Sequence, residues 1–302
     1  QRQMCIRDSD ETVEYARQFM EIILLGNVVT HLYLGLNAVL RASGHPKQAM
    51  YATIATVAIN TILAPIFIFM FDWGIRGAAI ATVSAQVIAL LWQLKQFNNA
   101  NELLHFRRGI FRLKRKIVFD SLAIGMSPFL MNLAACLIVI LINQGLKKYG
   151  GDLAIGAFGI VNRLVFIVVM IVMGLNQGMQ PIAGYNFGAK LYDRVNKVLK
   201  LTIIYATCVT TFGFLVGMLA PNLVVGIFTS DAELTELSAT GLRITVMFFP
   251  IIGFQMVTSN FFQSIGMAGK AIFLSLTRQM LILLPCLLIL PHFFGVAGVW
   301  YS

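Results

Sequence analysis

Long apolar runs separated by short polar segments constrain the fold of this sequence more than any other feature. A membrane-spanning helix requires about 20 predominantly apolar residues. Eight runs reach that length, and they lie near residues 19–40, 49–71, 77–97, 117–142, 153–175, 198–220, 241–263 and 271–294. A further apolar run begins at Gly295 and is cut by the end of the sequence. No run shows the alternation of a barrel strand, so we predict an all-α polytopic membrane protein with eight complete transmembrane helices.

The composition supports lipid as the main solvent. Of the 302 residues, 58% are hydrophobic and 12% are charged, whereas a soluble domain carries about 25% charged residues. The net charge of +10 could suggest a nucleic-acid partner, but the charge lies in short stretches between apolar runs, as in the loops of membrane proteins. We therefore expect a lipid bilayer as partner and no nucleic acid.

Lys and Arg are concentrated in alternate connections between the runs. The strongest example is LHFRRGIFRLKRK at 104–116, between the third and fourth runs. Because Lys and Arg are enriched in cytoplasmic loops, we expect this connection, and those after the first, fifth and seventh runs, to face the cytoplasm. These features predict a multi-pass protein of the cell inner (cytoplasmic) membrane.

Glycines and prolines recur at a nearly constant spacing, which indicates an internal repeat. The matched pairs lie 220 to 222 residues apart, and they are Gly44 with Gly266, Pro65 with Pro285, Gly74 with Gly295 and Gly77 with Gly298. Six runs separate the matched segments, so the two repeats should share one orientation, as in transporters with parallel repeats. The repeat predicts twelve helices in the intact protein, three of them before this sequence and most of one after it.

Four motifs carry a resemblance to a known family. They read LRASGHPKQAM, GIRGAAIATVSAQ, GLNQGMQPIAGYNFGAKLYDRV and NFFQSIG, and they are spread over residues 11–302. The sequence resembles the multidrug and toxic compound extrusion (MATE) family of cation-coupled antiporters. The resemblance implies two six-helix lobes around a central cleft, with this sequence covering helix four to the start of helix twelve.

The expected domain organisation follows from the repeat and the resemblance. Residues 1–10, QRQMCIRDSD, have no counterpart in the pattern and look like a non-native tail. Residues 11–98 should form helices four to six, the second half of the N-terminal lobe. Residues 99–116 should form a basic cytoplasmic loop between the lobes. Residues 117–302 should form the C-terminal lobe, from helix seven to the start of helix twelve.

The segment GLNQGMQPIAGYNFGAK, residues 174–190, places amide side chains and helix breakers after an apolar run. Proline removes a backbone donor, and irregular backbone at membrane depth is tolerated only inside protein or beside water. We predict that the helix bends here toward a polar cleft; the alternative is an ordinary helix end at the membrane interface. Two glycine pairs, Gly174 with Gly178 and Gly184 with Gly188, predict close contact with neighbouring helices.

Amide side chains inside the runs are the candidates for a substrate cavity, because polar side chains in lipid-embedded helices usually face the bundle interior. Asn176 and Gln180, for example, are four residues apart and share a helical face. The candidate cavity residues are Asn132, Asn176, Gln177, Gln180 and Gln255. The alternative is that such side chains only form hydrogen bonds between helices, each worth about 1 kcal/mol.

The resemblance also supplies candidates for ion coupling. One branch of the family carries an Asn-x-x-x-Asp pattern in helix five, and NTILA at 60–64 keeps Asn60 but has Ala64 in place of the acid. The helix-six threonine of that branch matches Thr82. Asn and Thr can supply oxygen to a cation, but neither can carry a proton. The resemblance therefore implies Asn60 and Thr82 as neutral helpers of a coupling acid on helix one, with Na⁺ or H⁺ as the coupling ion.

Motifs typical of enzymes are absent from the sequence, including GxSxG, HExxH and a complete phosphate loop. Isolated histidines and scattered cysteines predict neither a metal site nor a cofactor. The resemblance implies an ion-gradient-driven antiporter that exports organic, cationic drugs or toxic compounds, and we expect a monomer. The alternative is a lipid-linked saccharide flippase of the same superfamily. Charged cavity residues would favour a flippase, whereas VMIVMGLNQGMQ at 169–180 holds amides and methionines.

Overall fold

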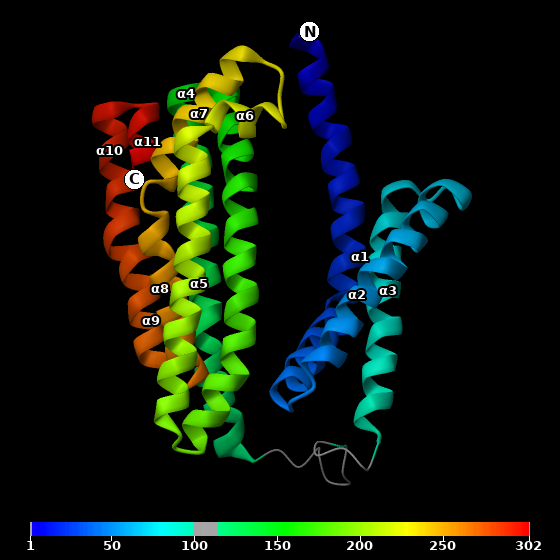
Figure 1. The fold of residues 1–302 in the computed structure, drawn as a ribbon. Coiled ribbons are helices and arrows are strands. Elements are labelled where there is room, and N and C mark those ends of the chain that lie inside the picture. Colours follow the sequence, from blue (N-terminus) through cyan, green and yellow to red (C-terminus); the bar gives the residue numbers. More distant parts are fainter. Residues whose placement is uncertain (1, 100–104, 106–113, 302) are drawn as a thin grey trace. The chain divides into compact units, whose positions relative to one another are not determined.

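The computed structural model describes residues 2–99, 105 and 114–301, and all regular elements in these ranges are helices (Figure 1). The chain divides into two compact units, Gln1–Arg112 and Leu113–Ser302, called unit 1 and unit 2 below. Most of the predicted basic loop 99–116 lies outside the described residues. The side chains of the predicted non-native tail, residues 1–10, also lie outside them.

Unit 1 contains three long helices. They are α1 (Arg2–Ala42), α2 (Pro46–Pro65), which continues into the π-helical segment η1 (Ile66–Met70), and α3 (Gly74–Phe97). Gly44, between α1 and α2, has a φ of 89°, a conformation in which glycine is strongly favoured. Pro65 has no backbone donor, and its place at the end of α2 explains why the regular hydrogen-bond ladder changes there to the π pattern.

Small side chains on α3 let the three helices of unit 1 pack closely. Ala81 and Ala85 are completely buried. One turn further along α3, Ala89 packs in a cluster with Tyr33 of α1 and Ala52 of α2. The three helices of unit 1 therefore share a narrow core, into which α1 and α2 also direct polar side chains.

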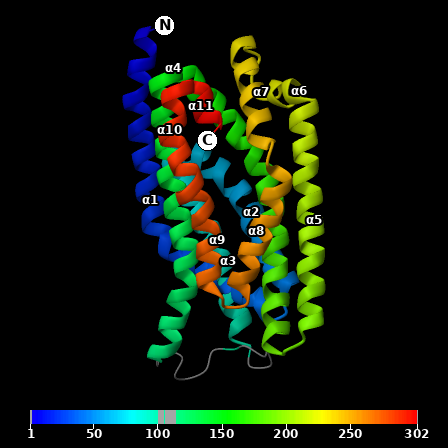
Figure 2. The same cartoon turned by 90° about the vertical axis from the view of Figure 1, so that its left-hand side faces the viewer.

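Unit 2 contains the remaining helices (Figure 2). They are α4 (Arg115–Gly188), α5 (Tyr192–Leu219), α6 (Pro221–Gly226), α7 (Ala232–Val246), α8 (Phe249–Ser264), α9 (Ala268–Leu276), the π-helical η2 (Thr277–Leu283), α10 (Leu284–Phe294) and α11 (Val296–Tyr301). The largest core cluster joins Val172 and Met179 of α4 with Ala206 of α5 and Val257 of α8. This three-helix contact positions the polar residues described below.

The number of spans differs in detail from the prediction of eight. Among the described residues, six helices are long and apolar enough to cross a membrane, or seven if α7 and α8, bent by 53° at their junction, form one span. The remaining difference arises in α4, which has 74 residues and contains two predicted runs, 117–142 and 153–175. Gly151, with a φ of 64° and a ψ of −160°, interrupts the helical backbone between them. The chain reverses direction at this point (Figure 2), so α4 is two antiparallel helices.

The predicted irregularity at 174–190 is not present. The helix continues through Pro181 as far as Gly188, and the chain turns only at Lys190, which has a φ of 60°. The prediction of close glycine contacts is correct only in part. A Cβ atom on Gly184 would lie 3.0 Å from the backbone oxygen of Ser264, whereas Cβ atoms on Gly174, Gly178 and Gly188 would meet nothing within 4 Å. One glycine of the four therefore admits a neighbouring backbone.

The glycines of the predicted repeat adopt matching conformations. Gly44 and Gly266 have φ values of 89° and 80°, and Gly74 and Gly295 have φ values of 52° and 58°. Each pair stands in the connection between two consecutive helical segments. Because L side chains rarely adopt these conformations, the recurrence of glycine at these positions has a direct backbone cause.

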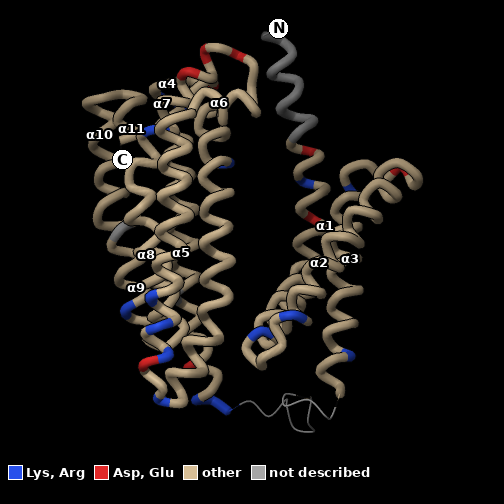
Figure 3. Tube along the Cα trace, in the orientation of Figure 1, with Lys and Arg blue, Asp and Glu red and all other residues tan. Residues whose placement is uncertain are grey.

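Charged residues separate between the two ends of unit 2 (Figure 3). One end, called the basic end below, contains the start of α4, the α4–α5 connection and the start of α9. Its described basic residues are Arg115, Lys116, Lys190, Arg194, Lys197, Lys200 and Lys270. The opposite end carries the acidic residues Asp152, Asp231, Glu233 and Glu236, together with Lys147 and Lys148. A basic end of this kind is typical of the cytoplasmic side of a membrane protein.

Candidate functional sites

Polar side chains connect the helices of unit 1. Thr30 of α1 donates a hydrogen bond of 2.6 Å to Oε1 of Gln86 on α3. Thr56 of α2 donates one of 3.2 Å to the hydroxyl of Tyr33 on α1. These bonds satisfy groups that would otherwise be buried without partners, so their first role is to hold the three helices together.

The two predicted ion-coupling residues lie on neighbouring helices of unit 1. Asn60, on α2, is half-buried, and its Oδ1 atom is buried with no hydrogen-bond partner among the described residues. Thr82, on α3, is half-buried and donates to the backbone oxygen of Ala78 at 3.0 Å. The hydrogen bonds found in the described part of the chain do not join Asn60 to Thr82, and their joint role stays a prediction. The unpartnered oxygen of Asn60 is the free acceptor that a cation or water would require.

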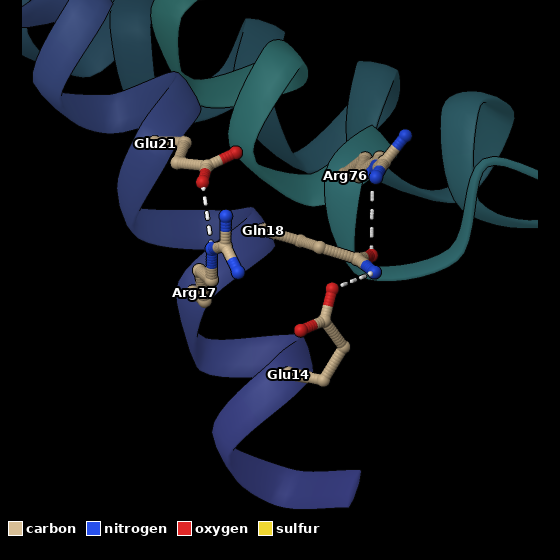
Figure 4. A network of polar contacts seen from close by, with 5 residues as sticks. All are labelled: Glu14, Arg17, Gln18, Glu21 and Arg76. Atoms are coloured by element: carbon tan, nitrogen blue, oxygen red, sulfur yellow. Dashed lines mark hydrogen bonds and ion pairs between the residues drawn. The ribbon is translucent and has the colours of Figure 1, made fainter.

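A separate polar network lies at the surface of unit 1 (Figure 4). Arg76, near the start of α3, donates to Gln18 of α1 at 3.2 Å, and Gln18 donates to Glu14 at 3.1 Å. Arg17 and Glu21 form an ion pair of 2.9 Å one turn away. All of these contacts are exposed, and exposed ion pairs contribute little free energy. The network fixes the start of α3 against α1 and was not foreseen from the sequence.

In unit 2 the structure pairs Gln180 with a residue outside the predicted set. Gln180 of α4 donates from Nε2 to Oδ1 of Asn260 on α8, at 3.1 Å. Asn260 in turn donates to the backbone oxygen of Met256 at 2.9 Å. Both side chains are half-buried. Asn260 stands in the motif NFFQSIG, but the stripe of Gln255, Ser259 and Gln263 drew attention to another face of the same helix.

Asn176 does not occupy the open position expected of a cavity residue. Its exposed fraction is 2%, and neither side-chain atom has a hydrogen-bond partner among the described residues. The cause is helical spacing, since Asn176 falls in the same stripe as Val172 and Met179, which pack against α5 and α8. The side chain is therefore a buried amide within unit 2.

The other predicted cavity residues lie in different surroundings. Gln177 is exposed, next to the buried Asn176. Asn132 is also exposed and donates to the backbone oxygen of Pro128, in its own helix, at 2.8 Å. Gln255, on α8, is half-buried. Of the five predicted residues, Gln180 alone forms a side-chain hydrogen bond to another helix in the contacts described above. A search of the described residues for three or more clustered His, Cys, Asp or Glu side chains finds no group that could hold a metal ion.

Sequence comparison places the chain among known transporters. The family model MatE matches residues 4–66 and 123–288, which is more than half of the chain. The multidrug export protein MepA of Staphylococcus haemolyticus (strain JCSC1435) is 29% identical over 298 residues, covering 97% of this chain and 64% of MepA. MepA of Staphylococcus aureus (strain NCTC 8325 / PS 47) is 28% identical over 296 residues, with the same shares. The chain thus spans 64% of the length of these curated relatives.

Structural comparison agrees with the sequence matches. The MATE multidrug transporter DinF-BH, solved in complex with a rhodamine dye, is 35% identical, with a TM-score of 0.86 over 95% of this chain and 65% of that one. An outward-facing MATE family transporter of the MOP superfamily is 24% identical and has the same fold, with a TM-score of 0.87 over 96% of this chain and 65% of its own. The relatives are transporters and not enzymes. The apolar helices, the family model and the related structures together show that the chain belongs to the MATE family of multidrug efflux transporters.

Proposed function

We propose that this protein is an ion-gradient-driven antiporter that exports organic cations across the cytoplasmic membrane as a monomer, with Na⁺ or H⁺ as the coupling ion. Three findings support the proposal. They are the family, the MepA relatives named as multidrug export proteins, and the DinF-BH structure with its bound rhodamine dye. The basic end of unit 2 further supports an orientation with that end in the cytoplasm.

The hydrogen bond between Gln180 and Asn260 is the observation that carries the proposal. It joins α4 to α8 at 3.1 Å, next to the apolar cluster that contains Met179 and Val257. Both side chains are neutral and only half-buried, so they keep donor and acceptor capacity for a bound molecule. A neutral polar group beside apolar surface suits a flat, apolar cation, because it adds no positive charge to repel the substrate.

The proposal is tested with purified protein reconstituted in liposomes. An inward or outward gradient of Na⁺, or of protons, is imposed, and the movement of the rhodamine dye is followed by its fluorescence. We expect the dye to accumulate against its own concentration gradient while one of the two ion gradients persists. Collapse of that gradient by an ionophore should stop accumulation, and protein-free liposomes serve as the control. Equal dye movement with and without either gradient would contradict ion coupling.

The alternative function, a lipid-linked saccharide flippase, is tested in the same vesicles. A fluorescent lipid-linked saccharide is incorporated, and its transfer between leaflets is measured by accessibility to a membrane-impermeant quencher. Recognition of a pyrophosphate anion requires basic side chains near the ligand, and the pair Gln180–Asn260 supplies amides instead. We therefore expect transport of the rhodamine dye without saccharide transfer. Saccharide transfer without dye transport would replace the proposed substrate class.

A further inference from the structure

One face of α5 changes from basic to apolar along its length. Lys197 and Lys200, near the start of the helix, are followed on the same face by Ile204, Cys208 and Leu215. Spacings of three and four residues, completed by Thr211, place these side chains in one row. Both lysines are exposed, and neither forms an ion pair in the part of the chain that the structure describes.

The apolar part of this face is a groove. Its volume is about 550 Å³, and it is called the α5 groove below. The lining residues are Ile203, Ile204, Thr207, Cys208, Thr211, Phe212 and Leu215. Phe212 is 69% exposed and Ile204 is 46% exposed, so the groove opens away from unit 2. Between residues 203 and 215 it follows about 18 Å of helix, close to the roughly 15 Å hydrocarbon thickness of one leaflet.

The start of the groove lies at the basic end of unit 2. Lys190 and Arg194 are exposed there too, and Lys270 of α9 lies with its Nζ atom 5.5 Å from the ring centre of Phe262 at the same end. Two aromatic side chains accompany them, since Tyr185 is 75% exposed and Tyr192 is 54% exposed. Exposed tyrosine beside lysine and arginine is typical of the level of lipid headgroups.

We propose that α5 binds one anionic phospholipid of the cytoplasmic leaflet. Lys197 and Lys200 bind the phosphate of the headgroup, and one acyl chain lies along the α5 groove. The assignment to lipid follows from the combination of two surfaces on one helix face. The lysines attract a phosphate and the groove buries a hydrocarbon chain of the length that one leaflet provides. Free phosphate would use the first surface alone, and a protein helix would use the second alone. The proposal depends on membrane insertion and is independent of the transported substrate.

The headgroup part of the proposal is tested by native mass spectrometry of the purified protein. Phosphatidylglycerol and phosphatidylcholine with identical acyl chains are titrated separately. Each basic residue near an anionic membrane surface contributes enough that loss of two corresponds to about a 30-fold change in affinity. We expect the Lys197→Gln/Lys200→Gln variant to bind phosphatidylglycerol about 30-fold more weakly and phosphatidylcholine unchanged. The charge-conserving Lys197→Arg/Lys200→Arg variant should retain affinity, which separates loss of charge from misfolding.

A matched control uses two adjacent exposed lysines at the opposite end of unit 2. Lys147→Gln/Lys148→Gln removes the same charge from the chain but should leave phosphatidylglycerol affinity unchanged. Equal loss in both double variants would show a general charge effect and would overturn the site. Competition by inorganic phosphate at the affinity of the lipid would also overturn it, because the lysines would then bind phosphate without an acyl chain.

The acyl-chain part is tested by filling the groove. Cys208 is exposed within it, so Cys208→Trp should weaken retention of both lipids, while Cys136→Trp, at an exposed cysteine on α4, should not. In membranes, Cys208 should react with a lipid-soluble maleimide more slowly when phosphatidylglycerol is present than when it is absent. Unchanged lipid retention in Cys208→Trp, or a Cys208 that is unreactive whatever the lipid, would contradict the proposal, because a protein segment would then cover the groove.

Discussion

Ser259 holds the position in unit 2 that Asn37 holds in unit 1, 222 residues earlier. Asn37 donates from Nδ2 to the backbone oxygen of Ala49 at 3.0 Å and to the hydroxyl of Thr53 at 3.3 Å. The hydroxyl of Ser259 bonds to the backbone oxygen of Ala271 at 3.4 Å and shares a 2.6 Å hydrogen bond with the hydroxyl of Ser275. The partners in the two units are separated by the same 222 residues. The repeat therefore extends to a buried polar contact that fixes each helix to the one after it.

Loss of either contact should lower stability by a similar amount. We expect Asn37→Ala and Ser259→Ala each to destabilise the protein by about 1 kcal/mol, the range found for buried hydrogen bonds and for bonds between membrane helices. Asn37→Ser should keep most of the stability, because serine forms the equivalent contact in unit 2. Thermal unfolding in detergent measures the effect, with Thr61→Ala, at an exposed threonine that bonds within its own helix, as control. Equal melting temperatures for Asn37→Ala and Thr61→Ala would show that the contact contributes nothing.

Glycine substitutions in the second half of α4 should have opposite effects. Gly184→Ala places a Cβ atom 3.0 Å from the backbone oxygen of Ser264, and we expect destabilisation of about 1 to 3 kcal/mol from overpacking. Gly178→Ala meets nothing within 4 Å and should stabilise the helix by about 0.5 to 1 kcal/mol. Thermal unfolding of the two variants, compared with the unsubstituted protein, measures both. A stabilising Gly184→Ala would mean that α4 and α8 separate at this point.

The sequence predicts the helices well and their ends poorly, for a physical reason. Hydropathy detects apolar length, so the runs at 117–142 and 153–175 were found. The helix nevertheless continues from the second run through Pro181 to Gly188. Whether a proline bends a membrane helix depends on which neighbours satisfy the freed backbone group. Likewise, Gly184 meets Ser264, eighty residues away along the chain, and no local pattern contains that partner.

The candidate site shows the same limit. Helical spacing placed Asn176 and Gln180 on one side of a helix, and the structure shows that the two amides differ in burial. Asn176 lies in the stripe that packs against α5 and α8, whereas Gln180, slightly further round, reaches Asn260. Periodicity identifies a stripe but does not tell which neighbour covers it. Pairing Gln180 with Asn260 requires the tertiary structure, because several helices separate them in the sequence.

The hydrogen bond between Gln180 and Asn260 should appear as a coupling energy. We expect Gln180→Leu and Asn260→Leu to be non-additive by about 0.6 kcal/mol, the average for membrane helices, in a double-mutant cycle followed by thermal unfolding. The single variants should also weaken binding of the rhodamine dye, measured by fluorescence anisotropy, if the amides face the substrate. A control cycle pairs Gln177→Leu with Asn260→Leu, since Gln177 is exposed and should be additive. Strict additivity in the first cycle would show that the bond does not contribute.

Asn176 should be replaceable by an apolar residue. Its amide is buried without a partner among the described residues, and an unsatisfied buried amide costs about 1 to 3 kcal/mol. Asn176→Leu is similar in volume and should therefore raise the melting temperature, whereas Gln177→Leu at the exposed neighbouring position should have little effect. A lower melting temperature for Asn176→Leu, with binding of the rhodamine dye retained, would instead indicate that an internal water or ion satisfies the amide.

Removal of the two predicted coupling residues should separate efflux from drug binding. Asn60 offers a buried Oδ1 atom without a partner among the described residues, and Ala64 supplies no acid one turn away. We expect Asn60→Ala, alone or with Thr82→Ala, to reduce gradient-driven transport of the rhodamine dye several-fold in liposomes while dye affinity changes less than twofold. Thr61→Ala is the matched control, because Thr61 is the exposed neighbour of Asn60 and bonds to Val57 in its own helix. Ala64→Asp adds a titratable group beside Asn60 and should make the transport rate more dependent on pH. If the double variant transports the dye at the unsubstituted rate under both Na⁺ and proton gradients, the coupling ion binds elsewhere in the protein and neither residue belongs to its site.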